Sequence, residues 1–518
     1  MTAKTVMFQG TASDVGKSVL TSAFCRIFAQ DGYRVAPFKS QNMALNSYVT
    51  KDGGEIGRAQ AVQAEAAQVE ATVDMNPILL KPKADTSSQV IIQGRSQQNM
   101  EAQEYFEHHE EGLSYVKESL NNLKNNYDIV ALEGAGSPAE VNLREYDLVN
   151  MKIAKLAEAP VILVADIDKG GVFASIVGTF KLLNDDEVER IKGIIINKFR
   201  GKVSRLESGL DFIEEYTGVP VLGVVPYFTD FRIPEEDSIP AERLKNRAQA
   251  EIEIAILRLP RISNFTDFTP LEEEMETTVR YIEAGDSLGN PDAVIIPGTK
   301  NTIADLEYLE KQGYAEQIKQ LAKQGVPIVG ICGGYQILGQ EIADPQGAES
   351  QGQIKEGLGL LNIKTVFAPD KTTRQVQGKI VAEQGFWARL TASTVSGYEI
   401  HMGQTEPLGG VKPLLKITQG SERLDGAINQ EGTVWGTYFH GIFDNDSFRQ
   451  QFINDLRRRK GLEELDFSQN LSTWEKRARA YEQLARVVRE NVDIDKVYQI
   501  MGLDTRGELD ACLMNLLL

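Results

Sequence analysis

Cysteine and histidine are scarce in this chain of 518 residues. The three cysteines, Cys25, Cys332 and Cys512, are too few and too scattered to form a disulfide framework. The histidines number 4, and no group of Cys and His has the spacing of a zinc site. The sequence therefore indicates a reducing, cytoplasmic setting, in which a cysteine thiol can serve as a reactive group.

Excess positive charge and long apolar runs are also lacking. The chain has 55 Lys and Arg against 74 Asp and Glu, a formal net charge of −19, which argues against nucleic acid or an anionic membrane as a partner. No apolar run reaches the roughly eighteen residues of a membrane span, and the first residues do not read as a signal peptide. An anionic substrate would therefore need local cationic pockets. Homo-oligomer formation stays open.

The apolar pattern predicts two α/β domains and a helical extension. Residues 1–232 alternate strands with helices, and their continuous apolar runs are typical of a buried, doubly wound parallel sheet. A polar stretch separates them from a second α/β domain at residues 251–450. Residues 451–518 are charged and helical in pattern. The strands expected in the first domain are 5–9, 127–133, 160–166, 191–197 and 220–225.

The segment Val329–Gly339 carries the strongest chemical signal. An apolar run ends in Cys332, two glycines follow, and a helix-like stretch begins. This order is typical of a nucleophile elbow, in which the N–H groups just after the nucleophile can face an oxyanion. A thiol placed in this way can attack an amide or ester carbon. The alternative is that Cys332 is a small buried core residue.

A base for this thiol is predicted far downstream, at His440 in the string Gly436–Phe443. His440 follows a short apolar strand. A Cys–His pair that is distant in sequence but adjacent in the fold is the usual arrangement for thiol nucleophiles. A histidine beside aromatic residues can equally be a packed core residue.

Together these motifs resemble the class I glutamine amidotransferase domain over roughly residues 251–450. The string Ile296–Thr299 extends the resemblance. It implies that the backbone N–H groups of Gly298 and Gly333 form the oxyanion hole.

One position departs from that family pattern. The family has a glutamate two residues after the histidine, and here the residue is Ile442. Without this carboxylate we expect His440 to be a poorer base and glutamine hydrolysis to be slower. Glu399 or His401 either assists in its place or has a structural or glutamine-positioning role.

A second motif, Gly10–Ser18, follows the strand at residues 5–9 and opens an apolar-periodic helix. Strand, glycine-rich loop and helix start are the context of a phosphate cradle. Lys17 adds a positive charge, and the Ser18 hydroxyl can ligate Mg²⁺. The loop is longer than the usual pattern and resembles the dethiobiotin-synthetase branch of P-loop proteins, which phosphorylates carboxylates or carbamates. The residues expected to bind the nucleotide through this loop are Gly10, Thr11, Gly16, Lys17 and Ser18.

A glutaminase joined to a P-loop domain indicates ATP-driven amidation, because carboxylates do not react with ammonia unaided. Further strings resemble the cobyric acid synthase family over nearly the whole chain. The resemblance implies amidation of the b, d, e and g carboxylates of adenosylcobyrinic acid a,c-diamide, with ATP, Mg²⁺ and glutamine. The strings are Pro37–Ser47, Gly54–Ala61, Glu133–Leu143, Arg258–Phe268 and Pro297–Thr302.

The same resemblance implies roles for further residues of the first domain. Glu133 would help Ser18 to hold Mg²⁺, and Asn197 would face the adenine. Asp147 is either an acidic residue at the amidation centre or the N-cap of a helix. Three cationic side chains would meet substrate carboxylates or phosphate, or lie at the surface: Lys39, Arg58 and Arg144.

Three other functions stay open. Cobyrinic acid a,c-diamide synthase shares both motifs and the same chemistry. A partition-type P-loop ATPase would leave the elbow at Cys332 without a purpose. The third is a non-catalytic binding module built on an inactive amidotransferase, which the missing triad glutamate would allow.

Overall fold

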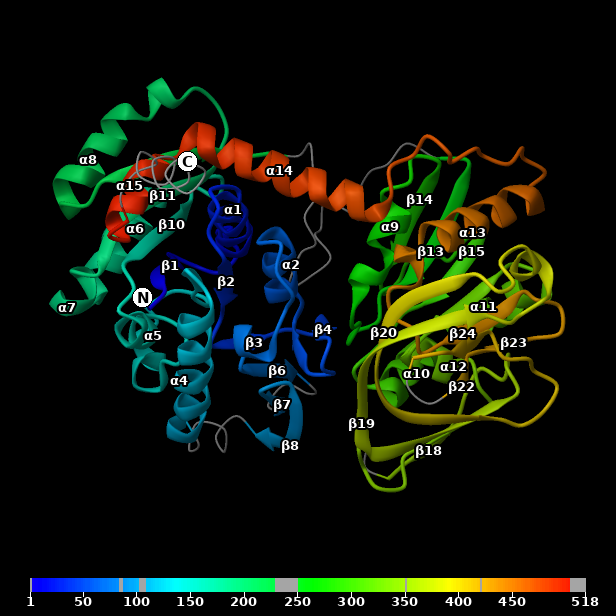
Figure 1. The fold of residues 1–518 in the computed structure, drawn as a ribbon. Helices are drawn as coiled ribbons and strands as arrows, with labels where there is room; N and C mark the ends of the chain where they lie inside the picture. The colour runs from blue at the N-terminus through cyan, green and yellow to red at the C-terminus, as the bar shows by residue number, and fades with distance from the viewer. Residues whose placement is uncertain are drawn as a thin grey trace, which may run out of the picture.

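Two α/β domains lie side by side, and the C-terminal helices reach back from the second domain to the first (Figure 1). This arrangement confirms the predicted α/β fold with parallel sheets and a helical tail. Cys512 and most of the expected linker lie outside the described residues. The computed structural model describes residues 2–82, 87–101, 109–228, 250–349, 352–419 and 422–503.

Six of the described strands of the first domain form a 6-stranded parallel sheet in the order β12-β11-β10-β1-β9-β2. Both faces of this sheet are covered, since Val6 and Phe8 of β1 pack in one hydrophobic cluster and Met7 packs in another. The bounds are β1 (Lys4–Gly10), β2 (Val35–Phe38), β9 (Ile129–Glu133), β10 (Val161–Asp166), β11 (Ile191–Phe199) and β12 (Val221–Pro226).

Helices pack on both sides of the sheet (Figure 1). Helix α1 begins directly after the glycine-rich loop and contributes to one cluster, whereas α4, α5 and α6 contribute to the other. The bounds are α1 (Lys17–Gln30), α2 (Arg58–Ala66), α4 (His109–Asn126), α5 (Met151–Ala157), α6 (Val172–Leu182), α7 (Asp185–Val188) and α8 (Glu207–Thr217).

A smaller part of the first domain faces the second domain. It holds a sheet in the order β3-β6-β7-β8 and the antiparallel pair β4-β5. Strand β4 lies against β20 of the second domain (Figure 1). The bounds are β3 (Gln41–Met43), β4 (Ser47–Val49), β5 (Glu55–Gly57), β6 (Ile78–Pro82), β7 (Ser87–Ile92) and β8 (Arg95–Glu101).

The described part of the second domain is built on a sheet in the order β14-β13-β15-β16-β24-β23, parallel except at β23. A second sheet has the order β18-β17-β19-β21-β22, with β20 paired to β19. The bounds of the first sheet are β13 (Ile252–Leu257), β14 (Thr277–Ile282), β15 (Ala293–Ile296), β16 (Ile328–Ile331), β23 (Ala427–Ile428) and β24 (Val434–Thr437). Those of the second are β17 (Glu341–Ala343), β18 (Ile354–Glu356), β19 (Ile363–Ile380), β20 (Thr394–Pro407), β21 (Leu415–Ile417) and β22 (Arg423–Asp425).

The helical extension ties the two domains together. Helix α13 packs in the core of the second domain, whereas α14 and α15 pack against α1 of the first. The guanidinium of Arg489 lies 2.8 Å from Asp31, and the hydroxyl of Tyr498 donates to the same carboxylate at 2.6 Å. In the described ranges, none of the helices is long and apolar enough to cross a bilayer. The helices of this half are α9 (Thr269–Glu272), α10 (Thr302–Lys311), α11 (Tyr314–Lys323), α12 (Gly333–Ile337), α13 (Asp446–Arg459), α14 (Thr473–Asn491) and α15 (Ile494–Ile500).

Candidate active sites

The predicted elbow is a strained turn between β16 and α12. Cys332 follows the last residue of β16 and has φ 51° and ψ −106°, an unfavourable conformation for a residue with a side chain. A Cβ on Gly334 would lie 1.9 Å from the carbonyl oxygen of Ile296, so only glycine permits this crossing. The turn places the thiol at the carboxyl edge of the parallel sheet, where functional groups gather.

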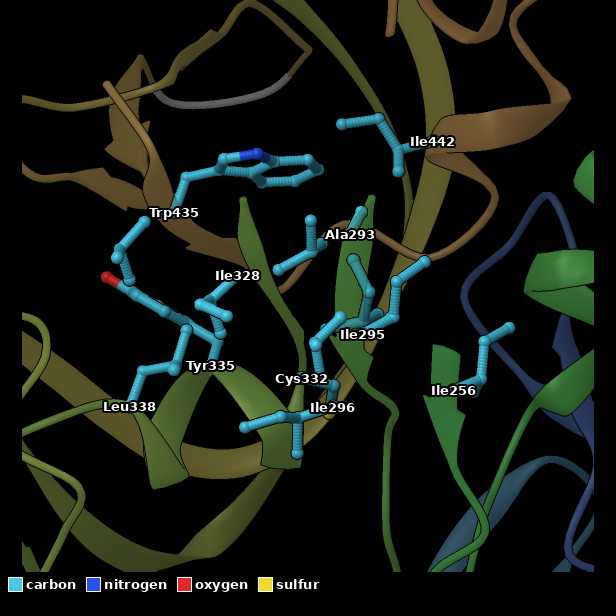
Figure 2. Packing of buried hydrophobic residues seen from close by; sticks show 14 of the residues in the cluster. Ile256, Ala293, Ile295, Ile296, Ile328, Cys332, Tyr335, Leu338, Trp435 and Ile442 are labelled. Atoms are coloured by element: carbon cyan, nitrogen blue, oxygen red, sulfur yellow. The ribbon is translucent and has the colours of Figure 1, made fainter. Parts of the chain in front are cut away.

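A continuous hydrophobic cluster supports this turn (Figure 2). Ile295 of β15 is paired with Val329 of β16, and Tyr335 of α12 lies near Trp435 of β24. Cys332 is 8% exposed and belongs to the cluster, as the core alternative predicted. Its sulfur, however, is also within hydrogen-bond distance of polar groups, so burial alone does not describe its surroundings.

His440 lies beside Cys332 because the two strands that precede them are neighbours. Strand β24 pairs in parallel with β16, and the Cys332 N–H donates to the Thr437 carbonyl at 2.9 Å. The His440 ring is hydrogen-bonded to the thiol and stacks on Tyr398, with ring centroids 5.2 Å apart. The structure therefore brings the predicted Cys–His pair together, as nucleophilic catalysis by a thiol requires.

A carboxylate that the sequence motif did not reveal holds the other edge of the His440 ring. Asp267 lies in the short turn Phe265–Phe268, and its Oδ2 is 2.6 Å from Nδ1 of His440. Its Oδ1 accepts a hydrogen bond from the Gly441 N–H at 3.0 Å. Both side chains are buried. Asp267 thus has the position of the orienting acid in a Cys–His–acid triad.

Asp267 also controls the charge of His440. Burial by itself lowers the pKa of His440, but the Asp267 carboxylate and the hydrogen bond with Cys332 outweigh burial and raise this pKa to about 10. An imidazole with such a pKa keeps a proton taken from the thiol. It can then deliver that proton to a departing amine.

The expected substitutes for the triad glutamate are engaged elsewhere. Ile442 packs in the hydrophobic cluster (Figure 2). Nδ1 of His401 lies 2.8 Å from a backbone carbonyl oxygen two residues on. Because Asp267 supplies the carboxylate, the reason to expect a weak His440 no longer holds. Glu399 forms ion pairs with two arginines, Arg374 and Arg423.

Both expected oxyanion donors lie next to the thiol. A Cβ added to Gly298 would lie 3.2 Å from Cε1 of His440 and 3.7 Å from Cβ of Cys332. Gly333 is the first residue of α12, where backbone N–H groups have no partner within the helix. A side chain at Gly298 would therefore fill the space beside the nucleophile.

We expect Asp267→Asn to lower kcat for glutamine hydrolysis by about 10²- to 10⁴-fold. An asparagine stabilises neither the required tautomer of His440 nor its protonated form. Glutamate release at saturating glutamine measures the effect, and Asp286→Asn, in a loop of the same domain, is the control. An unchanged kcat in Asp267→Asn would mean that His440 does not depend on this carboxylate.

In the first domain, the loop Gly10–Ser18 connects β1 to α1 as predicted. The N–H of Thr11 donates to a carbonyl of β10 at 2.9 Å. The ammonium of Lys17 donates to the carbonyl oxygens of Ala12, at 2.9 Å, and Gly136, at 3.0 Å, so it is held across the loop. Lys17 thus lies where it can meet the oxygens of a bound phosphate group.

Asn197 supports this loop from the end of β11. Its side-chain nitrogen donates to the Val15 carbonyl at 2.9 Å. Gly16 has φ 95°, and a Cβ there would lie 2.2 Å from that nitrogen. The loop therefore has no side chain at position 16, next to the helix start. Its backbone N–H groups stay accessible there, as binding of the phosphate groups of a nucleotide requires. The expected contact of Asn197 with adenine stays a prediction.

Glu133 lies at the end of β9, beside the loop. It accepts hydrogen bonds from the Ser18 hydroxyl (2.8 Å), Lys39 (3.1 Å) and Gln63 (2.5 Å). Burial by itself raises the pKa of Glu133, but Lys39 and the two neutral donors hold it below its ordinary value. Among the described residues, no group of three or more His, Cys, Asp or Glu could hold a metal. Mg²⁺ needs less, because one carboxylate, a hydroxyl and nucleotide oxygens suffice.

Comparisons with known proteins identify both domains. Residues 6–241 match the CobQ/CobB/MinD/ParA nucleotide binding domain, and residues 253–448 match the CobB/CobQ-like glutamine amidotransferase domain. A cobyric acid synthase from Dehalococcoides mccartyi is 50% identical over 505 residues, covering 96% of this chain and 99% of that protein. One from Moorella thermoacetica is 52% identical over 509 residues, covering 97% and 98%. The chain belongs to the cobyric acid synthase family.

Membership of this family confirms the resemblance that the motifs predicted. A further relative, a probable cobyric acid synthase from Methanothermobacter thermautotrophicus, is 51% identical over 509 residues. That match covers 97% of this chain and 100% of the relative. The chain is thus a glutamine amidotransferase of cobalamin biosynthesis that carries a P-loop nucleotide-binding domain.

Three cationic residues were expected, from the resemblance to cobyric acid synthases, to contact substrate. In the structure their surroundings differ. Lys39 is buried and paired with Glu133, on the nucleotide side. The Arg58 guanidinium lies 5.6 Å from the ring centroid of Tyr48, and its buried Nε has no hydrogen-bond partner among the described residues. Arg144 donates to a backbone carbonyl at the end of α6. The structure does not bring these three residues into one group.

The N-cap position of α5 is held by Asn150 and not by Asp147, but Asp147 accepts hydrogen bonds from backbone N–H groups at this helix start. Its Oδ1 accepts from the N–H groups of Val149 (2.9 Å) and Asn150 (2.8 Å), and its Oδ2 accepts from the Lys152 N–H (3.0 Å). These groups lie at the start of α5, whose first N–H groups have no partner within the helix. Both oxygens are thus engaged by the backbone, and a role at the amidation centre stays a prediction.

We expect Asp147→Asn to leave turnover near normal and to lower the free energy of unfolding by about 0.5–1 kcal/mol. Asparagine keeps an acceptor for two of the backbone donors and loses the acceptor for Lys152. Chemical denaturation and amide formation measure the two effects. A large loss of turnover at unchanged stability would instead establish the acidic role at the amidation centre.

Contacts between the domains reach the His440 side of the thiol pocket. The Ser47 N–H donates to Oδ1 of Asn264 at 2.9 Å, and the Phe265 N–H donates to Oδ1 of Asn46 at 3.1 Å. Nδ2 of Asn264 lies 3.5 Å from Nε2 of His440. The first domain therefore helps to position the residues that surround His440.

A buried ion cluster joins the domains on the other side of that pocket. Glu55 of β5 accepts from Lys81 of β6 at 2.9 Å and from Lys371 of β19 in the second domain. Burial by itself raises the pKa of Glu55, but the two lysines outweigh it and hold this pKa well below its ordinary value. Both lysines also line the pocket of Cys332. The thiol pocket is therefore closed in part by the first domain.

Proposed function

We propose that this chain amidates the b, d, e and g carboxylates of adenosylcobyrinic acid a,c-diamide, using ATP and ammonia from glutamine. The observation that carries the proposal is the assembly of Cys332, His440 and Asp267 in one chain with a phosphate-binding loop. Its relatives, named cobyric acid synthase at about half identity over nearly full length, support the corrinoid substrate.

In the glutaminase half, the Cys332 sulfur attacks the side-chain amide carbon of glutamine. His440 takes the thiol proton and returns it to the leaving nitrogen, so that ammonia departs and a thioester forms. The N–H groups of Gly298 and Gly333 stabilise the oxyanion. Water, activated by His440, then releases glutamate. Asp267 keeps the ring oriented through both steps.

In the amidation half, the loop Gly10–Ser18 and Lys17 bind the phosphate groups of ATP. Ser18 and Glu133 would hold Mg²⁺, the lower pKa of Glu133 keeping its carboxylate ionised. When bound, ATP supplies the phosphoryl group that turns a substrate carboxylate into an acyl phosphate, which ammonia attacks. Lys17 offsets the charge that develops on the phosphate oxygens.

Joining the two halves has a chemical reason. Ammonia released into bulk water is diluted and largely protonated, whereas ammonia released beside the other domain stays neutral and at high effective concentration. The contacts of Lys81, Asn46 and Ser47 around the thiol pocket support delivery toward the first domain.

The test measures glutamate release from glutamine with and without ATP and the corrinoid diamide. We expect glutamate and new corrinoid amide to form in equal amounts when all substrates are present. Cobyrinic acid as the competing substrate separates the sibling reaction, cobyrinic acid a,c-diamide synthesis. Consumption of cobyrinic acid with no reaction of the diamide would overturn the proposed substrate.

A further inference from the structure

The thiol pocket holds two charged side chains that the proposed reaction has not used. Cys332, Gly298 and Gln336 line one pocket together with Lys300 and Glu349. The amide end of glutamine must lie at Cys332 and Gly298. Glutamine also carries an ammonium and a carboxylate on its α-carbon, and these must lie elsewhere in the same pocket.

Lys300 is a buried lysine that forms no ion pair with any of the described residues. It is 9% exposed, and within the described part of the chain its ammonium forms no hydrogen bond or ion pair. Burial lowers the pKa of Lys300, and the nearby ammonium groups of Lys371 and Lys81 lower it further. Both neighbours are already bound to Glu55. An unpaired buried ammonium is costly, and an incoming carboxylate would remove that cost.

Glu349 is the matching acidic side chain. It is 9% exposed, and its Oε2 accepts from the Thr302 N–H at 2.9 Å. The Thr302 hydroxyl donates to Oε1 of Gln336 at 2.9 Å, so the carboxylate is fixed relative to α12, the helix that follows Cys332. Burial raises the pKa of Glu349, although Lys300 lowers it. The two side chains influence each other's charge, yet no ion pair joins them.

We propose that Lys300 binds the α-carboxylate of glutamine and that Glu349 binds its α-ammonium group. This inference rests on the proposed glutaminase function and deepens it. A glutamine zwitterion between the two side chains places an opposite charge beside each of them, which favours their charged forms. It also fixes the distance from the α-carbon to Cys332. The pair would thus select a free amino acid with a side-chain amide over other amides.

The experiment pairs each variant with a substrate that lacks the matching charge. Glutaramate is glutamine without the α-ammonium group, and glutaminamide is glutamine with its α-carboxylate replaced by an amide. Ammonia release gives kcat/KM for each compound with the wild type, Lys300→Met and Glu349→Gln. Lys319→Met, a lysine on α11 whose ion pair with Glu316 is largely exposed, is the control.

We expect Glu349→Gln to reduce kcat/KM for glutamine by about 30-fold or more, and to change kcat/KM for glutaramate little. Lys300→Met should likewise reduce kcat/KM for glutamine by about 30-fold or more, and it should change kcat/KM for glutaminamide little. A variant that loses activity equally on glutamine and on its analogue would overturn the inference. Wild-type protein that releases no ammonia from glutamine would instead overturn the proposed function itself.

Alkylation of Cys332 by iodoacetamide gives a second measurement that needs no variant, should either substitution prevent folding. Glutamine should slow alkylation of the wild-type thiol at concentrations where glutaramate and glutaminamide give little protection. Equal protection by the three compounds would contradict recognition of the α-groups.

Discussion

Replacing Cys332 by serine is expected to reduce glutamine-dependent amidation by on the order of 10⁴- to 10⁶-fold, while ammonia still supports the reaction. Serine fits the same strained turn, but its hydroxyl is a far weaker nucleophile than the thiol next to His440. The thiol serves only the release of ammonia. Corrinoid amide formation with glutamine and with ammonium salts, measured side by side, gives the comparison.

The control for this substitution is Cys25→Ala. Cys25 is the other thiol among the described residues and is fully buried in α1, where burial, and to a lesser extent Glu133, raises its pKa. Its loss should leave glutamine use intact. If Cys332→Ser lost the ammonia-driven reaction as well while remaining folded, the division of labour between the two domains would be wrong.

Replacing Lys17 by alanine should have the opposite pattern and abolish amidation with either nitrogen donor. The Lys17 ammonium lies across the glycine-rich loop, where it offsets the charge of the transferred phosphoryl group. We expect a loss of about 10²- to 10³-fold in amide formation with ammonia. Glutamate release without ATP should persist, because Cys332 and His440 are untouched.

A matched variant in the same domain is Lys155→Ala, whose ion pair with Asp186 lies at the surface. It should keep full activity. Normal amidation in Lys17→Ala, with either donor, would exclude the phosphate-cradle role of the loop.

Local signals in the sequence predicted the parts of both sites that are themselves local. The elbow at Cys332 depends on an apolar strand followed by glycines, and the loop Gly10–Ser18 depends on a strand, glycines and a helix start. These patterns are read from neighbouring residues, so the fold class and the positions of the motifs followed from them.

Asp267 could not be predicted in this way, because it lies 173 residues from His440 in the sequence. Its position depends on how the turn after β13 packs against the segment after β24. The spacing of apolar residues in the sequence does not predict this packing. The available signal was an aspartate shortly after the carboxyl end of a predicted strand, in the string Arg258–Phe268. The family pattern places the acid at position 442, where this chain has Ile442, and so it does not point to Asp267.

The contacts of the C-terminal helices with the first domain likewise could not be predicted from the sequence. The charged pattern of residues 451–518 predicted helices but not their partners. In the structure α14 and α15 return to the first domain, where Tyr498 and Arg489 bind Asp31. Such pairing is set by surface complementarity between distant segments.

The central claim is that nitrogen released at Cys332 becomes corrinoid amide nitrogen in the same protein. Mass spectrometry of the corrinoid formed from the a,c-diamide, ATP and glutamine labelled with ¹⁵N in its side-chain amide tests this most directly. The account predicts that the product is cobyric acid in its adenosylated form, with ¹⁵N in each new amide group. Release of labelled ammonia with an unchanged corrinoid, or a corrinoid amide without the label, would contradict it.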